Sequence, residues 1–318
     1  MSVIGIDIGG TKVALALFSE GGGILRREVA AVEGREGGEV GALVTERVCA
    51  LLGAAEAAGD AVRGVGAAVP GIAHAGSGRV WAPNLPGWDD YPLREELEAV
   101  VGRGVRVAVD SDRAAYILGE TWRGTARGCR NAVFVAVGTG IGAGILVDGR
   151  VLRGARDIAG AIGWLALDRP YRAGYDSYGC FEYQASGAGL VRQAKDLLAA
   201  GAAYAGPLRD GEVTTARLFS LYGSGDAIAT RAIDNAVELW GMAAANLVSL
   251  FDPEMVVFGG GVFGPAARFL ERIEAEARRW GQPISTPQVR FGVSSLGGDA
   301  GLHGAGQLAK PQPLAASR

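Results

Sequence analysis

The stretch V-I-G-I-D-I-G-G-T-K-V-A-L-A-L-F, residues 3–18, sets the architecture of the chain. Two apolar runs flank a glycine pair, which is typical of a β-hairpin. Glycines lack a Cβ, so the amides at such a tip can converge on an anion. The carboxylate of Asp7 suits an anion that carries Mg²⁺ better than a bare one. The stretch therefore predicts a hairpin that holds a nucleotide phosphate with its metal, with an ordinary tight turn as the alternative.

Composition narrows the class of protein. The chain has 318 residues, 49% of them hydrophobic, which suits two domains of about 150 residues. With 34 acidic and 31 basic residues it has no basic excess, so we expect no nucleic-acid partner. No apolar run approaches the roughly 20 residues of a membrane helix. Three scattered cysteines argue against a disulfide scaffold, and a first strand at residue 3 leaves no room for a signal peptide. We therefore expect a cytoplasmic protein.

A second strand–turn–strand unit, residues 132–147, echoes the first hairpin half a chain later. The echo predicts an α/β fold built from two similar halves with a ligand cleft between them. Residues 74–90 are expected to form a long loop and residues 310–318 a frayed tail. Helices are predicted over residues 39–58, from 92, and over 113–122, 187–200, 214–221, 226–251, 265–280 and 299–308, and further strands over 65–69, 105–109 and 255–258.

Three glycine-rich turns directly follow strands, at residues 9–12, 138–142 and 259–261. A nucleotide needs several sets of backbone donors around its phosphates and an apolar groove for its base. No P-loop and no dinucleotide fingerprint occurs. Together the turns predict a nucleotide site of another kind, and three purely structural turns are the alternative.

Polar residues near these turns are candidates for catalysis and substrate binding. Asp112 precedes a helix and suits a general base that aligns a hydroxyl for attack on a γ-phosphoryl group. A helix N-cap is the alternative role, for which Asp110 and Ser111 also compete. Glu182 is a candidate for binding sugar hydroxyls or an ordinary first-turn acid. Asn84 is a candidate for the same binding role or for shaping a turn.

These motifs together resemble the ROK family (repressors, open reading frames and sugar kinases) of the actin-like ATPase superfamily. The resemblance runs from about residue 3 to 308. It rests on D-I-G-G-T-K at 7–12, P-N-L-P-G-W at 83–88, S-D-R-A-A-Y-I-L-G-E at 111–120, G-T-G-I-G-A-G at 138–144, G-C-F-E at 179–182 and F-G-G-G-V at 258–262.

The resemblance implies two actin-like (RNase H-like) lobes that close on ATP·Mg²⁺ and a sugar. The first lobe would span residues 1–117, completed by a helix at 299–309, and the second residues 118–298. Homo-oligomers, dimers or tetramers, are also implied.

Site residues follow from the matching positions. Asp112 would be the catalytic base, and Asp7 would hold Mg²⁺ through water. The implied phosphate- and ATP-binding residues are Gly9, Gly10, Thr11, Lys12, Gly138, Thr139, Gly140, Gly259, Gly260 and Gly261. The implied substrate-binding residues are Asn84, Ser111, Asp112, Trp164 and Glu182.

The chain departs from the family pattern in three places. Ser111 stands where the family usually has Asn, and Ala161 and Trp164 stand where it has a Glu and a His that hold sugar hydroxyls. Trp164 suits stacking on an apolar sugar face or a place in the core. The family's zinc motif is reduced to Cys180 within residues 173–180, so we expect no zinc site. In its place we expect packing by Trp164, Tyr171, Tyr175 and Tyr178.

The sequence thus predicts an ATP-dependent kinase of a hexose such as glucose. Two alternatives stay open. The acceptor is an amino sugar, an N-acyl sugar or a cyclitol, because polar groups at residues 161 and 164 are lost. Otherwise the protein is a sugar-sensing member of the family without catalysis, against which the intact Asp7 and Asp112 argue.

Overall fold

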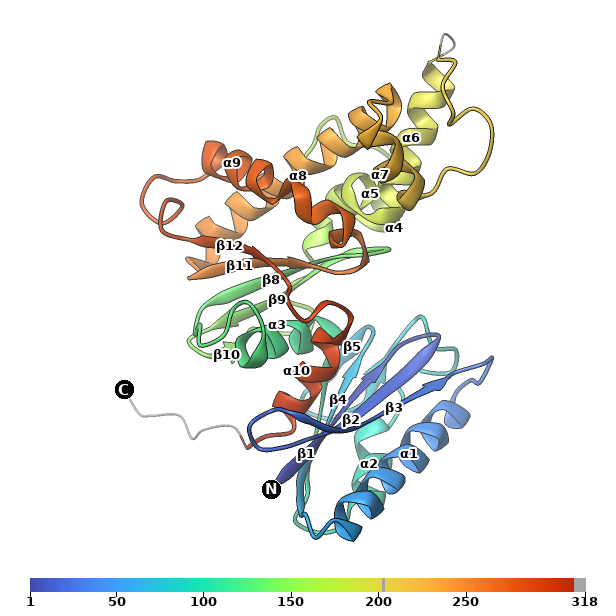
Figure 1. Ribbon diagram of the computed structural model, residues 1–318, viewed down its shortest axis with the longest axis vertical. Helices are drawn as coiled ribbons and strands as arrows, with labels where there is room; N and C mark the ends of the chain where they lie inside the picture. Colours follow the sequence, from blue (N-terminus) through green and yellow to red (C-terminus); the bar gives the residue numbers. More distant parts are fainter. Residues whose placement is uncertain (202–203, 312–318) are drawn as a thin grey trace.

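The computed structural model describes residues 1–201 and 204–311, and it has two lobes, each built on a five-stranded sheet (Figure 1). The strand orders are β3-β2-β1-β4-β7 and β10-β9-β8-β11-β12. The first sheet contains β1 (Ser2–Ile8), β2 (Lys12–Phe18), β3 (Ile24–Ala31), β4 (Val62–Val69) and β7 (Arg106–Ser111). The second contains β8 (Ala132–Val137), β9 (Ile141–Val147), β10 (Arg150–Val151), β11 (Met255–Gly259) and β12 (Arg290–Val293).

The two sheets repeat one pattern of pairing. In each, the first two strands form an antiparallel hairpin, and the first strand pairs in parallel with a later one. Asp7 lies opposite Ala14 near one hairpin tip, and Val137 lies opposite Ile141 at the other. Parallel pairing requires crossover segments, which the intervening helices supply. The expected duplication of two α/β halves is therefore confirmed in the topology.

Ten α-helices are found in the described residues, and most match the predicted ranges. The first lobe carries α1 (Gly38–Ala57) and α2 (Leu93–Val101). The helices that follow are α3 (Asp112–Arg123), α4 (Tyr175–Tyr178), α5 (Cys180–Ala185), α6 (Gly187–Ala200), α7 (Thr215–Gly223), α8 (Ala227–Phe251), α9 (Leu270–Trp280) and α10 (Ala300–Leu308).

Helices α3 and α10 pack against each other between the two sheets (Figure 1). Helix α10 lies on β1 and β4, whereas α3 lies on β8 and β9. Their crossing is close, since a Cβ on Gly304 of α10 would be 1.7 Å from the carbonyl oxygen of Ala115 in α3. Only glycine permits this approach. The pair joins the lobes and brings the start of each helix to the junction.

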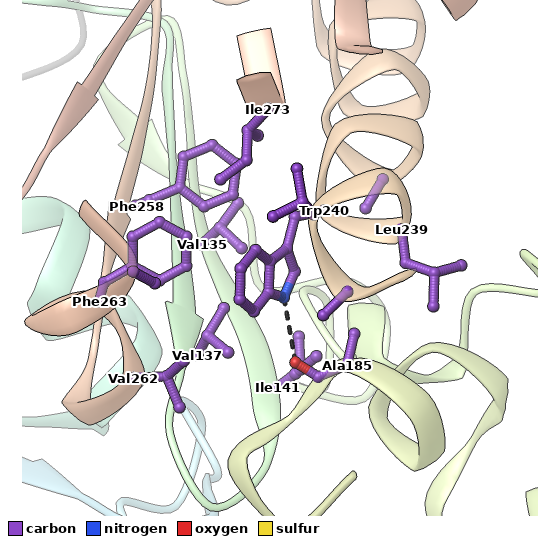
Figure 2. Close-up of a cluster of buried hydrophobic side chains, with 14 of the residues drawn as sticks. Val135, Val137, Ile141, Ala185, Leu239, Trp240, Phe258, Val262, Phe263 and Ile273 are labelled. Atoms are coloured by element: carbon purple, nitrogen blue, oxygen red, sulfur yellow. Dashed lines mark hydrogen bonds between the residues drawn. The ribbon is translucent and has the colours of Figure 1, made fainter. Parts of the chain in front are cut away.

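The core of the second lobe surrounds Trp240 on α8 (Figure 2). Its indole contacts residues of β8, β11 and the 3₁₀-helix η2 (Gly261–Phe263), with Phe263 5.2 Å away between ring centres. Its Nε1 donates to the carbonyl oxygen of Ala185 at 3.0 Å, which satisfies the one polar atom of the ring. This core fixes the glycine turns that follow β8 and β11.

Two predictions of secondary structure need correction, and a third lies mostly outside the described residues. Residues 74–90 are not a plain loop, because β6 (Val80–Trp81) pairs there with β5 (Ile72–Ala73). The predicted helix 265–280 is divided into the 3₁₀-helix η3 (Pro265–Phe269) and α9, and η1 (Ile162–Trp164) and η4 (Gly297–Asp299) are further 3₁₀ turns. Of the predicted tail, residues 312–318 lie outside the described residues. None of the helices in the described part of the chain is both long and apolar enough to cross a membrane.

Candidate active site

Asp112 is the first residue of α3, directly after β7, and its charge acts on Asp7 of β1. Ser111, in an extended conformation, is the N-cap of α3, and its Oγ accepts the amide N–H of Ala114 at 3.3 Å. Asp112 is therefore not the N-cap, and the alternative role considered for it is wrong. Its carboxylate accepts the Arg113 amide at 2.7 Å and the Tyr116 hydroxyl at 3.5 Å. Burial raises the pKa of Asp112, although the Arg113 charge opposes the rise.

Asp7 is the penultimate residue of β1 and lies near Asp112, whose charge acts on it. A Cβ on Gly301, in the first turn of α10, would be 2.7 Å from an Asp7 carboxylate oxygen. Burial raises the pKa of Asp7 from 3.8 to about 6, and the neighbouring Asp112 charge adds to the rise, while Lys12 opposes it. Within the described residues the Asp7 carboxylate makes no hydrogen bond or ion pair, so it is available to a ligand.

Asp7 and Asp112 thus form a pair of mutually repelling carboxylates, and Tyr116 lies beside both. Burial raises the Tyr116 pKa, and the two carboxylates add to this effect. Two partly buried anions with few donors are costly to keep ionised. A cation beside Asp7 would relieve that cost, so the Asp7 carboxylate fits a role in holding Mg²⁺, which prefers oxygen ligands. Sequence reasoning missed Tyr116, for which the i, i+4 spacing from Asp112 is the available signal.

The two hairpin tips present unpaired amides. Gly9 donates to the Lys12 carbonyl at 2.9 Å and Gly138 to the Gly140 carbonyl at 2.9 Å, which closes each turn. Asn84 lies beside the first tip, since a Cβ on Gly10 would be 3.0 Å from its carbonyl oxygen. The amides that donate to no acceptor among the described residues belong to Gly10, Thr11, Thr139 and Gly140. Such clustered free amides suit an anion.

Glu182 on α5 lies behind the second tip. Its Oε2 accepts the Ile141 amide at 2.6 Å, and a Cβ on Gly140 would be 2.7 Å from the same oxygen. Burial raises the pKa of Glu182, although the Ile141 amide opposes the rise. This residue therefore supports the turn, and its second carboxylate oxygen is open to a hydroxyl. The role of Glu182 in sugar binding stays a prediction.

A cavity of about 550 Å³ lies beyond the second tip, where α6 begins. Gly138 and Thr139 line it, and Gly261 is the only one of the three predicted adenosine-side glycines that does. Gly259 instead packs on Phe134, and Gly260, at φ 91°, packs on Val137. The other lining residues, which sequence reasoning missed, are Gly187, Ala188, Val191, Glu212, Val213, Thr214, Thr215 and Val262.

Hydrogen bonds organise the segment that resembles a zinc motif. The Asp168 carboxylate accepts from Tyr175 at 3.1 Å and from the buried Gln184 at 2.9 Å. Burial raises the pKa of Asp168, but hydrogen bonds from its neighbours outweigh burial and leave this pKa below its usual value. The described residues contain no group of three or more His, Cys, Asp or Glu side chains placed to hold a metal ion.

The expected aromatic packing of this segment is partly wrong. Trp164 is 58% exposed, so it belongs neither to this packing nor to the core. Tyr183 takes its place, with ring centres 5.3 Å from Tyr175 and 6.4 Å from Tyr178. The Arg192 guanidinium lies over Tyr183 at 4.2 Å. Gly179 packs on the backbone of Trp164, and the neighbouring Gly163 lies beside the Glu182 side chain.

The chain is similar over nearly its whole length to known proteins of one family. The family model described as "ROK family" matches residues 3–312. A glucokinase of Streptomyces coelicolor is 33% identical over 98% of each chain. A ROK hexokinase structure from Thermus thermophilus is 33% identical with a TM-score of 0.79, over 97% of this chain and 98% of that one. A ROK glucokinase from Streptomyces griseus, in complex with glucose and AMPPNP, is 32% identical with a TM-score of 0.72, over 97% and 99%.

Proposed function

The chain belongs to the ROK family, and from this premise we propose that it is an ATP-dependent kinase that phosphorylates a hydroxyl of a hexose such as glucose. The fold expected for this activity, two actin-like α/β lobes, is confirmed. One observation carries the proposal. Ser111, and not Asp112, caps α3, and the Asp112 carboxylate lies near enough to Asp7 for its charge to help raise the Asp7 pKa.

In the proposed reaction, Asp112 takes the proton of the acceptor hydroxyl. The hydroxyl oxygen forms a bond to the γ-phosphorus while the bond from that phosphorus to the β,γ-bridging oxygen breaks, which releases ADP. Phosphoryl transfer has a loose transition state, so positioning and charge stabilisation supply most of the catalysis. The raised pKa of Asp112 suits a group that accepts a proton and later returns it to solvent.

The phosphates would lie between the two hairpin tips. The free amides of Gly10 and Thr11 would approach them from one lobe, and those of Thr139 and Gly140 from the other. The cavity of about 550 Å³ beyond the second tip has room for the adenosine, with Gly261 and Val262 on one wall. Gly138 would both close the second tip and line the cavity. Gly9 and Lys12 would shape the first tip, and Gly259 and Gly260 would shape the turn after β11, without lining the cavity.

Asp7 would hold Mg²⁺ through water. Bound Mg²⁺ would neutralise charge on the phosphates. Asp7 fits this role because its carboxylate is partly buried and repelled by Asp112.

The acceptor itself is the open part of the proposal. Asn84, Ser111 and Glu182 would bind its hydroxyls, and the exposed indole of Trp164 offers a flat apolar face. Ala161 and Trp164 supply no carboxylate or imidazole, which favours an acceptor with a less polar edge, such as an N-acyl sugar, as the second candidate.

A panel of hexoses, amino sugars, N-acyl sugars and cyclitols, each with ATP·Mg²⁺ and mass detection of the product, tests the function. A phosphorylated hexose supports the first candidate, and a phosphorylated N-acyl sugar the second. Tight sugar binding without any phosphorylated product contradicts both and favours a sensor.

We also propose that the chain forms dimers or tetramers in the cytoplasm, as the family resemblance implies. The cysteines Cys49, Cys129 and Cys180 are free thiols, which agrees with a reducing compartment. Light scattering on the purified protein measures the oligomer, and a monomer would contradict this part of the proposal.

A further inference from the structure

A buried carboxylate of the first lobe pairs with an arginine of the second. Asp110, at the end of β7, has a side chain that is 5% exposed, and its Oδ2 accepts from the Arg153 guanidinium in the loop after β10. Its Oδ1 accepts the Ser111 amide at 2.8 Å. The Asp110 carboxylate therefore connects Arg153 to the backbone of Ser111, the residue directly before Asp112.

The loop that carries Arg153 is fixed to β9. Leu152 donates its amide to Ile145 at 2.8 Å, and Ala159 donates to the Arg153 carbonyl at 2.9 Å. Strand β9 begins at Ile141, directly after the second hairpin tip. A continuous set of contacts thus runs from that tip through β9 and Arg153 to Asp110.

The same loop touches the first lobe a second time. Asp157, at φ 57°, accepts the Ala75 amide at 3.3 Å and lies 3.8 Å from the His74 ring nitrogen. These contacts hold the loop across the lobe junction independently of Arg153. Replacement of the Arg153 guanidinium should therefore leave the loop in place and remove only the ion pair with Asp110.

We propose that Arg153 is a positioning residue that, by holding Asp110, sets the Asp112 carboxylate in register with the phosphate-binding tip of the opposite lobe. The inference rests on the proposed kinase function. Removing one partner of a buried ion pair also leaves an uncompensated charge, so stability and positioning must be measured separately.

A set of five variants separates the two effects. Arg153→Met keeps the apolar stem and removes the guanidinium. Arg153→Lys keeps the charge. Asp110→Asn removes the buried anion, and the double variant Asp110→Asn/Arg153→Met removes both charges at once. Arg156→Met changes an exposed arginine of the same loop and is the matched control.

For a positioning role, Arg153→Met lowers kcat about tenfold or more while KM for ATP changes less than twofold. Arg153→Lys recovers part of kcat. The double variant regains the melting temperature of the wild type but keeps the low kcat, and Arg156→Met resembles the wild type. A wild-type kcat in Arg153→Met, or recovery of kcat together with stability in the double variant, would overturn the proposal.

Hydrogen exchange tests the same link without any activity. In Arg153→Met the amides of residues 106–116, among them the Ser111 amide held by Asp110, should exchange faster than in the wild type or in Arg156→Met. Unchanged exchange contradicts the positioning role. If the wild type phosphorylates no acceptor but exchange still rises, the kinase function fails and the Arg153 link stands. If Arg153→Met does not fold, Arg153→Lys and the double variant carry both measurements.

Discussion

The Oγ of Ser111 accepts the amide N–H of Ala114 at 3.3 Å, so Ser111 is the residue that caps the N-terminus of α3. The adjacent Asp112 is the first residue of the helix. A helix N-terminus needs an acceptor, and both Ser and Asp are preferred there. Because Ser111 supplies it, the Asp112 carboxylate is spared that task. Its acidity is then set by burial and by the groups around the junction.

Asp112→Asn should lower kcat about 10²–10⁴-fold, because the amide cannot take the hydroxyl proton. Its shape is conserved, so the melting temperature should not fall. Coupled ADP detection with saturating sugar measures kcat. Glu56→Gln, an exposed carboxylate on α1, is the matched control and should keep the wild-type rate. A rate near that of the wild type in Asp112→Asn would remove this residue from the mechanism.

Activity should decline as the pH falls through about 6, because Asp7 must be ionised to attract Mg²⁺. Its pKa is raised from 3.8 to about 6, so its ionised fraction decreases at a pH where an ordinary carboxylate is still charged. The pH profile of kcat/KM at fixed free Mg²⁺ measures this limb. An activity that is flat down to pH 5 would contradict the assignment.

Asp7→Asn provides the complementary measurement on stability. A carboxyl whose folded-state pKa is raised stabilises the fold most below its unfolded pKa, and this contribution is lost as pH rises through the folded value. At pH 7.5 the ionised Asp7 therefore destabilises the fold. The Asn variant should be inactive yet melt a few degrees higher than the wild type in the absence of nucleotide and Mg²⁺. A lower melting temperature would mean that Asp7 has an unrecognised partner.

Local patterns in the sequence were sufficient to predict both hairpins and the glycine tips, whereas the role of Asp112 as catalytic base rests on the family resemblance and stays a prediction. Strand alternation, turn residues and helix periodicity act over a few residues, so they can be read without the tertiary fold. The exclusion of Asp112 as the N-cap needed the backbone, because Ser111 and Asp112 are both preferred caps and only the extended conformation at Ser111 decides between them.

Contacts between distant segments escaped prediction. Nothing in the sequence distinguishes Arg153 and Asp110 from charged residues on the surface. Only the packing of the two lobes pairs them and buries the Asp110 carboxylate. Thr214 and Thr215 line the cavity of about 550 Å³ because α7 packs against α6. The hydrogen bonds of Asp168 could not be predicted either. Its partners Tyr175 and Gln184 lie on helices too short to show a clear periodicity in the sequence.

Asp168→Ala should destabilise the fold by about 2 kcal/mol, because the hydroxyl of Tyr175 and the buried amide of Gln184 lose their shared acceptor. Thermal melting measures the effect, and Asp196→Ala, at an exposed site on α6, is the matched control. Treatment of the wild type with EDTA should leave its melting temperature unchanged. Stoichiometric zinc in the purified protein, or a large loss of stability with EDTA, would show that a metal and not Asp168 organises this segment.

Glu182 has two candidate tasks that two substitutions can separate. Glu182→Gln keeps a carbonyl oxygen for the Ile141 amide, so the turn and the melting temperature should be preserved. If the charged oxygen also binds a sugar hydroxyl, KM for the sugar should rise about tenfold or more while KM for ATP stays constant, because hydrogen bonds to charged groups contribute about 1.5–3 kcal/mol. Glu182→Ala leaves the Ile141 amide unpaired, so it should lower the melting temperature and raise both KM values. If Glu182→Gln keeps the wild-type KM for sugar while Glu182→Ala disturbs both substrates, Glu182 supports the turn and does not bind the acceptor.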